Sequence, residues 1–209
     1  MIQLDGSRVW NINPLVVSVD NFASDDQCET LISTAERRLR RAKIVTGDGS
    51  VILSGERTNS AAYFQKSDEP PVVQQLKFMI GAIIRMPITN AEPFQVLHYK
   101  VSQQFTPHLD GFALSDDPDR ITKFEADGGQ RLFSTMIYLN DVKEGGATSF
   151  PKLNISVEPR RGRLLIFANT LAGSRDSVNL ALHAGDPVSV GEKWSAITWW
   201  RDRTPGGVV

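Results

Sequence analysis

The sequence predicts a β-rich α+β domain in which helices near the N-terminus support a body of strands. Apolar residues recur at helical spacing in two early segments, whereas from Pro93 onward short apolar or alternating runs are separated by Gly, Pro, Asn and Asp. A length of 209 residues, with 41% hydrophobic and 22% charged, is typical of one soluble globular domain. We expect one domain over residues 1–209, with helical support over about 22–92 and a strand core over about 93–203.

Two helices are expected before the strands. Ser24-Asp25-Asp26-Gln27 has the spacing of a capping box, which predicts a helix running to about Arg41. Arginines at 37, 38, 40 and 41 indicate a solvated helix end, with a phosphate-binding patch as the alternative. The second helix starts near Pro71, since proline is tolerated in the first turn. Its broad apolar face predicts a core position: Val72, Val73, Leu76, Met79, Ile80, Ile83 and Ile84.

Five strands are expected in the second half of the chain, over residues 94–100, 131–140, 162–168, 178–184 and 194–201. Residues 113–130 are rich in Asp, Gly and Pro and are interpreted as a long polar loop. Loops of that length in compact domains are often lids or binding loops.

Composition argues against several classes of partner. The 23 Lys and Arg nearly balance the 24 Asp and Glu, so no overall field favours nucleic acid. No apolar run approaches the roughly 20 residues needed to cross a bilayer, so no membrane partner is expected. The single Cys28 and an N-terminus without the features of a secretory signal predict a reducing, cytoplasmic setting.

The chemistry is expected at His108 and Asp110. In an extended segment both side chains point to one side, because side chains alternate along a strand. His183, on a distant predicted strand, offers a third ligand. Two histidines and one carboxylate are the facial triad of non-haem Fe(II) oxygenases, although a His-x-Asp pair alone is usually a chance arrangement.

Lys193 directly precedes the last predicted strand, and alternation places it on the same face as Ser195, Ile197 and Trp199. An inward ammonium needs an anionic partner, because burying it unpaired is very costly. A dicarboxylate cosubstrate would supply that partner. The alternative is a lysine that reaches solvent at the strand end.

Four stretches resemble the catalytic domain of prolyl 4-hydroxylases, which are Fe(II)/2-oxoglutarate dioxygenases: residues 99–110, 131–151, 159–169 and 182–201. The most specific motifs are YLNDVKEGGATSFP at 138–151, LHAGDPV at 182–188 and GEKW at 191–194. The resemblance spans residues 94–203. It implies a distorted double-stranded β-helix, or jelly roll, with His108, Asp110 and His183 as iron ligands.

The resemblance also assigns cosubstrate and substrate residues. It implies that Lys193 pairs with the distal carboxylate of 2-oxoglutarate, helped by the hydroxyls of Tyr99 and Thr148. Tyr99 could instead be a core residue, and Thr148 could cap a turn.

Arg131 matches a position that faces the peptide substrate, and Trp199 matches an aromatic close to the iron pocket. Arg131 could equally pair with Asp127, and Trp199 could belong to the core. Ser102 stands where similar enzymes usually have glycine, and the segments 110–131 and 171–179 look longer than usual.

The resemblance implies hydroxylation of a prolyl residue in a peptide or protein at carbon 4, with release of succinate and CO₂. Fe(II) is the implied metal, 2-oxoglutarate and O₂ are cosubstrates, and ascorbate is an optional reductant. The alternatives are the same chemistry on a free amino acid or small metabolite, and a non-catalytic binding domain. The oligomeric state is left open.

Overall fold

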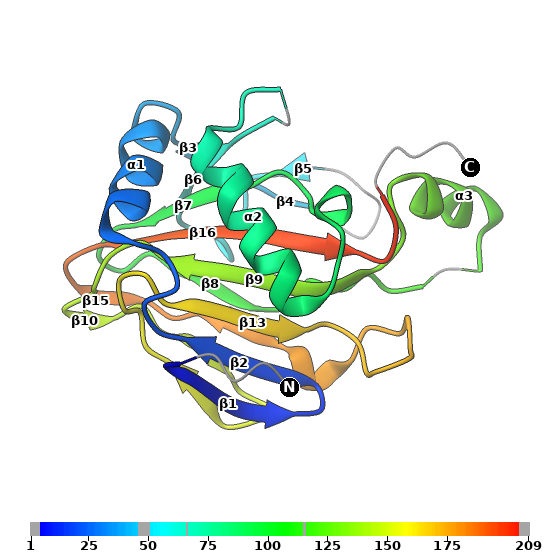
Figure 1. Cartoon of the computed structure of the whole chain (residues 1–209). Helices are drawn as coiled ribbons and strands as arrows, with labels where there is room; N and C mark the ends of the chain where they lie inside the picture. The colour runs from blue at the N-terminus through cyan, green and yellow to red at the C-terminus, as the bar shows by residue number, and fades with distance from the viewer. Residues whose placement is uncertain (1–4, 46–50, 66, 115, 205–209) are drawn as a thin grey trace.

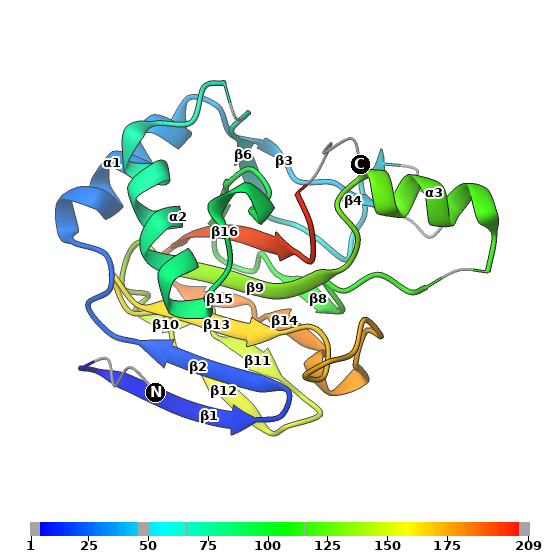
Figure 2. The ribbon, with the colours of Figure 1, turned by 45° about the vertical axis from the view of Figure 1, so that its right-hand side comes forward.

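The chain folds into two facing β-sheets with helices on the outer side of the larger one (Figures 1 and 2). The computed structural model describes residues 5–45, 51–65, 67–114 and 116–204. The larger sheet has eight strands in the order β1-β2-β13-β9-β16-β7-β6-β3, and a four-stranded sheet has the order β12-β11-β14-β8.

The strands are β1 (Ser7–Ile12), β2 (Leu15–Val19), β3 (Arg40–Arg41), β4 (Ile44–Val45), β5 (Val51–Ile52), β6 (Ser60–Tyr63), β7 (Gln95–Tyr99), β8 (Phe105–His108), β9 (Arg131–Tyr138), β10 (Glu144–Gly145), β11 (Thr148–Phe150), β12 (Ile155–Val157), β13 (Leu164–Ala168), β14 (His183–Gly185), β15 (Val188–Val190) and β16 (Lys193–Arg201). The helices are α1 (Asp25–Glu36), α2 (Pro71–Ile84), α3 (Pro118–Ala126) and two 3₁₀ turns, η1 (Ile88–Asn90) and η2 (Asn179–Ala181).

The eight-stranded sheet has an apolar layer on each face because its side chains alternate. One cluster joins residues of α1 and α2 to one face of the sheet, including Leu31, Leu76 and Trp200. The other joins the opposite face to the four-stranded sheet, including Tyr138 and Phe150. The predicted double-stranded β-helix with supporting helices is therefore confirmed.

Helix α1 begins as predicted but ends earlier. Ser24 and Gln27 form the reciprocal capping box, and Cys28, Leu31 and Ala35 are buried. The expected continuation to Arg41 is wrong, because Arg40 and Arg41 form the edge strand β3 paired with β6. Pairing at the sheet edge satisfies the backbone there, whereas these exposed arginines offer no apolar face to hold a helix.

The N-terminal part of the chain contains strands besides the helices expected as support over about 22–92. The hairpin of β1 and β2 lies before residue 22 and adds to the large sheet through β13. Strand β6 pairs with β7 inside the 22–92 segment. These strands are short, so their period-two signal was weak beside that of the two helices. The predicted strand at 178–184 is also too long, since η2 occupies its first part and β14 begins at His183.

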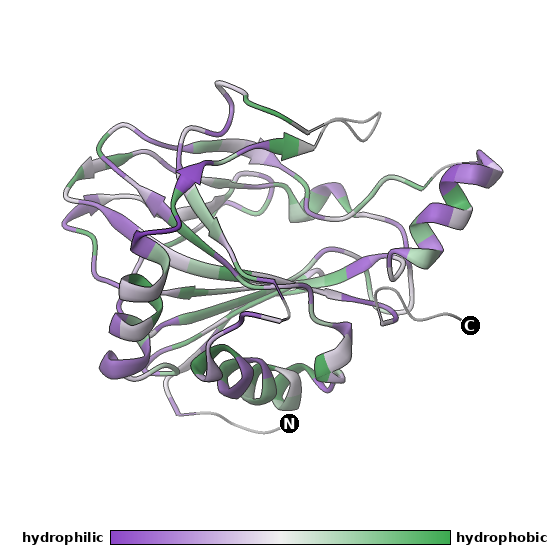
Figure 3. Cartoon of the chain, turned by 90° about the horizontal axis from the view of Figure 1, so that it is seen from above, coloured by the Kyte–Doolittle hydropathy of each residue, from purple (hydrophilic) through white to green (hydrophobic). Residues whose placement is uncertain are grey.

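The long polar loop predicted at 113–130 contains helix α3, so that prediction is wrong in part. The Asp117 carboxylate accepts hydrogen bonds from the backbone of Asp119 and Arg120, and Pro118 occupies the first turn. These are ordinary helix-start signals. The helix projects away from the sheets and has no buried residue (Figure 3). No helix in the described ranges is long and apolar enough to span a membrane.

Ser102 occupies a strained backbone position just after β7. Its φ is 66°, in the left-handed region that glycine tolerates and other L-residues rarely adopt. Its amide donates to the Val188 carbonyl at 2.8 Å, so the turn is held in place.

We expect Ser102→Gly to stabilise the protein by about 0.5–1 kcal/mol, because the relief of strain exceeds the added entropy of the unfolded chain. Urea denaturation of the two proteins would measure this change. Ser102→Val should change stability in the opposite direction, since a β-branched residue fits this region worst. A less stable glycine variant would contradict the assignment of strain.

Candidate active site

The pairing of β14 with β8 places the two distant histidines side by side. His183 lies directly opposite His108 in the register, and their ring centroids are 4.4 Å apart. Asp110 follows β8 by two residues and is buried. The Nε2 atom of His108 lies 3.7 Å from Asp110 Oδ1, and that of His183 lies 3.4 Å from Oδ2. Potential ligand atoms of the three residues all lie within 4.8 Å of one another.

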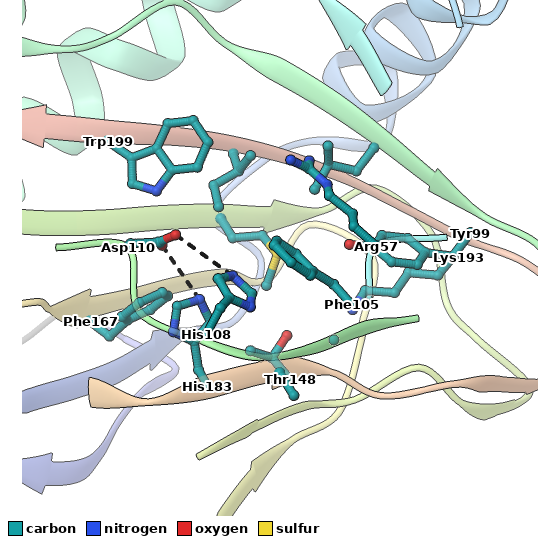
Figure 4. Close-up of a pocket in the computed structure, with 15 residues that line it drawn as sticks. Arg57, Tyr99, Phe105, His108, Asp110, Thr148, Phe167, His183, Lys193 and Trp199 are labelled. Carbon is teal, nitrogen blue, oxygen red and sulfur yellow. Dashed lines mark ion pairs between the residues drawn. The ribbon is translucent and has the colours of Figure 1, made fainter. Parts of the chain in front are cut away.

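Backbone carbonyls orient both imidazoles. The Nδ1 of His108 is 2.8 Å from the Thr106 carbonyl, and the Nδ1 of His183 is 3.0 Å from the Ala181 carbonyl. Because a carbonyl only accepts hydrogen bonds, each Nδ1 carries a proton, and Nε2 is the ring nitrogen that can offer a lone pair to a metal. Both lone pairs are therefore available on the side where Asp110 lies (Figure 4).

The charge state of the cluster suits a divalent metal. Burial, followed by the neighbouring His183, lowers the pKa of His108, which keeps that imidazole neutral. Burial acts to raise the pKa of Asp110, but His183 and His108 outweigh it and the pKa is lowered. Two imidazoles and one carboxylate are the donor set of a 2-His-1-carboxylate iron site, so these residues fit Fe(II).

The three side chains line one end of a pocket between the two sheets, and Lys193 lies beside Tyr99 at the other end (Figure 4). The pocket has a volume of about 470 Å³, including its open mouth. Lys193 is 1% exposed, and burial lowers its pKa to about 8, with Asp186 and Glu158 acting in the opposite direction. No ion pair joins it to a carboxylate in the described part of the chain.

Aromatic faces and hydroxyls surround the Lys193 ammonium. Its Nζ lies 5.2 Å from the ring centroid of Tyr99 and 5.4 Å from that of Tyr138. The Tyr138 hydroxyl lies 2.8 Å from Thr148 Oγ1 and 3.2 Å from the Val157 carbonyl, which places the Thr148 hydroxyl at this end of the pocket. Burial raises the pKa of Tyr99 to about 12, so its phenol stays a proton donor. This end of the pocket therefore offers an ammonium and two hydroxyls to an anion.

Arg57 is a pocket residue that the sequence did not single out. It is 8% exposed, its guanidinium lies 4.9 Å from the Phe105 ring centroid, and Phe105 stacks on His108 at 3.5 Å. Arg57 donates to Asn59 Oδ1 and to the Lys43 carbonyl, and it has no carboxylate partner among the described residues. A buried arginine without a carboxylate partner indicates a binding site, but the sequence does not show that Arg57 is buried. Only the tertiary structure, which places it beside Phe105, could identify this residue.

Arg131 and Trp199 lie together at the Asp110 end of the site. The Arg131 guanidinium lies 3.9 Å from the centroid of the Trp199 ring and binds both carboxylate oxygens of Glu92 at 2.7 and 2.8 Å. The alternative pairing of Arg131 with Asp127 is wrong, since Asp127 pairs with Lys123 instead.

Trp199 lines the pocket, but Arg131 does not. The indole nitrogen of Trp199 is buried without a partner among the described residues. This donor, held beneath the Arg131 guanidinium, remains available to a bound molecule.

Residues 94–201 match the model of a family described as the 2OG-Fe(II) oxygenase superfamily. The chain is 33% identical over 197 residues to prolyl 4-hydroxylase subunit alpha-1 of Homo sapiens, covering 93% of this chain and 35% of the relative. It is 33% identical over 214 residues to probable prolyl 4-hydroxylase 8 of Arabidopsis thaliana, covering 92% of this chain and 70% of the relative. The chain thus spans about a third of the length of the animal relative.

Among solved structures, this fold is similar to the viral collagen prolyl hydroxylase from Paramecium Bursaria Chlorella virus-1 in its 2OG complex. The TM-score is 0.70 at 26% identity, and the match covers 89% of this chain and 95% of the viral one. A Pseudomonas putida prolyl-4-hydroxylase, at 20% identity and a TM-score of 0.58, shares the fold over 90% of this chain and 92% of its own.

Proposed function

The chain belongs to the 2OG-Fe(II) oxygenase superfamily, and we propose that it hydroxylates a prolyl residue in a peptide or protein at carbon 4. One observation supports this most: a single pocket holds the two histidines and Asp110 at one end and the buried, unpaired Lys193 at the other. The names of the relatives direct the proposal to proline.

His108, Asp110 and His183 would hold the iron, and the Lys193 ammonium would bind the distal carboxylate of 2-oxoglutarate with Tyr99 and Thr148. When bound, iron and 2-oxoglutarate supply the oxidising chemistry, in which O₂ is consumed, succinate and CO₂ are released, and a C–H bond becomes C–OH.

The apolar walls exclude water from this reaction. Met136, Phe167 and Ile197 line the pocket between the two ends and are 6%, 1% and 8% exposed. Trp199, fixed against Arg131, would provide an aromatic wall and a free N–H donor for the substrate. The protein itself would therefore contribute by holding the substrate close to the metal and by limiting the access of water.

A second candidate is the same reaction on a free amino acid or small metabolite. Arg57 favours it, because a buried guanidinium without a carboxylate partner could bind the carboxylate of a small substrate. A peptide lacks that group at an internal proline and would present a carbonyl oxygen to Arg57 instead.

Succinate formation from 2-oxoglutarate and Fe(II) would distinguish the candidates. We expect turnover to rise with proline-rich peptides, which should gain the mass of one oxygen. Stimulation by free proline or another metabolite alone would favour the second candidate. Failure of the protein to bind Fe(II) or 2-oxoglutarate would instead favour a non-catalytic binding domain. We propose ascorbate as a reductant, and the same assay run with and without it tests that role.

Affinity for 2-oxoglutarate is expected to fall as pH rises through about 8, where Lys193 loses its proton. The ammonium is present below that pH, and up to about tenfold in affinity should be lost per pH unit above it. Titration of 2-oxoglutarate between pH 7 and 9.5 with Mn(II) bound would measure the effect. Lys193→Met should bind weakly and show no such dependence. An unchanged affinity across this range in the unmodified protein would contradict the role of Lys193.

A further inference from the structure

Two buried polar side chains form a hydrogen-bonded chain that ends at Asp110. Ser134 on β9 and Asn169 just after β13 are 0% and 1% exposed. Ser134 Oγ lies 2.6 Å from Asp110 Oδ2, and Asn169 Nδ2 lies 3.0 Å from Ser134 Oγ. They therefore form a chain of hydrogen bonds that ends on one oxygen of the carboxylate.

The direction of this chain follows from the available protons. A serine hydroxyl has one proton, and the Asn169 amide donates into its oxygen. The proton of Ser134 has two acceptors, Asp110 Oδ2 at 2.6 Å and Asn169 Oδ1 at 3.4 Å. The nearer acceptor is also the charged one, and charge-assisted hydrogen bonds are short and strong. Ser134 therefore donates to Asp110.

Backbone contacts hold the donor group in place. The backbone N–H of Asn169 donates to the Leu132 carbonyl at 2.9 Å, and the backbone N–H of Val178 donates to the Asn169 backbone carbonyl at 3.0 Å. At Gly111, immediately after Asp110, an added Cβ would lie 3.4 Å from the Asn169 Cβ and 2.7 Å from Ser177 Oγ. The backbone after Asp110 is thus packed closely against Asn169.

The number of oxygens that Asp110 gives to a metal decides how many positions stay open. This step rests on the proposed function, which needs two positions for 2-oxoglutarate and one for O₂. Iron held by one oxygen of Asp110 and two imidazoles would keep three of its six positions open. If both oxygens of Asp110 bound, only two positions would remain, and 2-oxoglutarate would fill them.

We propose that Ser134, oriented by Asn169, reserves Asp110 Oδ2 and restricts Asp110 to one metal-binding oxygen, Oδ1. The hydrogen bond lowers the ability of Oδ2 to bind iron, whereas Oδ1 accepts no hydrogen bond in the described part of the chain and lies 3.7 Å from His108 Nε2. Ser134 and Asn169 are thus positioning residues: they act on the metal through Asp110 and touch neither substrate nor cosubstrate.

The test uses nitric oxide as a spectroscopic probe of the open position. Under anaerobic conditions, the protein with Fe(II) and 2-oxoglutarate should bind nitric oxide and give an electron paramagnetic resonance signal. In Ser134→Ala we expect iron and 2-oxoglutarate to bind within about threefold of their original affinity. The affinity for nitric oxide should fall by about tenfold or more, because a second oxygen from Asp110 would occupy the position that nitric oxide needs.

Matched variants separate this role from a general loss of packing. Ser134→Thr keeps a hydroxyl and should restore nitric oxide binding. Ser195→Ala removes another fully buried serine hydroxyl, one without a partner among the described residues, and should leave all three affinities unchanged. Asn169→Ala should weaken nitric oxide binding less than Ser134→Ala, and it provides a second measurement if Ser134→Ala does not fold.

Nitric oxide binding to Ser134→Ala with the original affinity would overturn the proposal. A loss of iron affinity as large as the loss of the nitric oxide signal would also overturn it, because Ser134 would then be needed for iron binding by Asp110 and not for the open position. Failure of the unmodified protein to bind iron is a different result, which would remove the proposed function itself.

Discussion

Replacing His108 with alanine is expected to abolish Fe(II) binding and all succinate formation while leaving the fold largely intact. Only His183 and Asp110 would remain, and two ligands hold a divalent ion loosely. The loss should exceed the roughly 10–100-fold found for groups that only orient a ligand. The His108 side chain is 22% exposed at the pocket, so its removal leaves no closed cavity. Anaerobic iron titration, succinate assay and thermal denaturation would measure the three effects.

His98 provides a matched control for this substitution. It is stacked on Trp194 with 4.1 Å between ring centroids, and its Nε2 lies 2.8 Å from Glu192 Oε2. It lies on the face of β7 opposite Tyr99, because neighbouring strand residues point to opposite sides. His98→Ala should therefore retain iron binding even where it lowers thermal stability. Undiminished turnover in His108→Ala would refute the ligand assignment.

Replacing Lys193 with methionine is expected to raise the 2-oxoglutarate requirement by roughly 30-fold or more without loss of iron. Removing one partner of a buried charge pair costs about 2–5 kcal/mol of binding, and each 1.4 kcal/mol is tenfold in affinity. Methionine retains most of the side-chain volume, so the pocket walls should stay packed. Iron titration and the dependence of succinate formation on 2-oxoglutarate would separate the two outcomes.

The same substitution should leave the ligand-free protein as stable as before, or more stable. The pKa of Lys193 is lowered to about 8, so its ammonium is charged at pH 7 at a cost to the folded state. That cost is fully present below pH 8 and disappears as the side chain deprotonates at higher pH. Lys100→Met, at an exposed neighbouring lysine, should alter neither cosubstrate affinity nor stability. Equal affinity in Lys193→Met and the original protein would refute the anchor.

Strand alternation predicted much of the site. Lys193, Ile197 and Trp199 share a face in the sequence pattern, and all three line the pocket. The same alternation separates the helix-facing core from the sheet-facing core. Alternation is a local property of the backbone, so one sequence suffices to reveal it.

Features that depend on partners distant in sequence were missed or only partly predicted. The end of α1 was misplaced because β3 pairs with β6, a contact that no local pattern records. The alternative of a loop carboxylate as partner of Arg131 was wrong, because Arg131 pairs with Glu92, 39 residues away. Arg57, Ser134 and Asn169 were missed since their residue types are common and only burial gives them meaning.

The sequence by itself determined which residue types are available in or beside the strands: two histidines, a carboxylate and a lysine. Tertiary structure decided that these groups meet, because the register of β14 on β8 places His183 opposite His108. It also decided that Asp110 Oδ2 accepts a hydrogen bond from Ser134, and that Lys193 and Arg57 are buried without a carboxylate partner in the described residues. The physical reason is that ligation and desolvation depend on distances across the fold, whereas sequence patterns report only the direction of each side chain along its own strand.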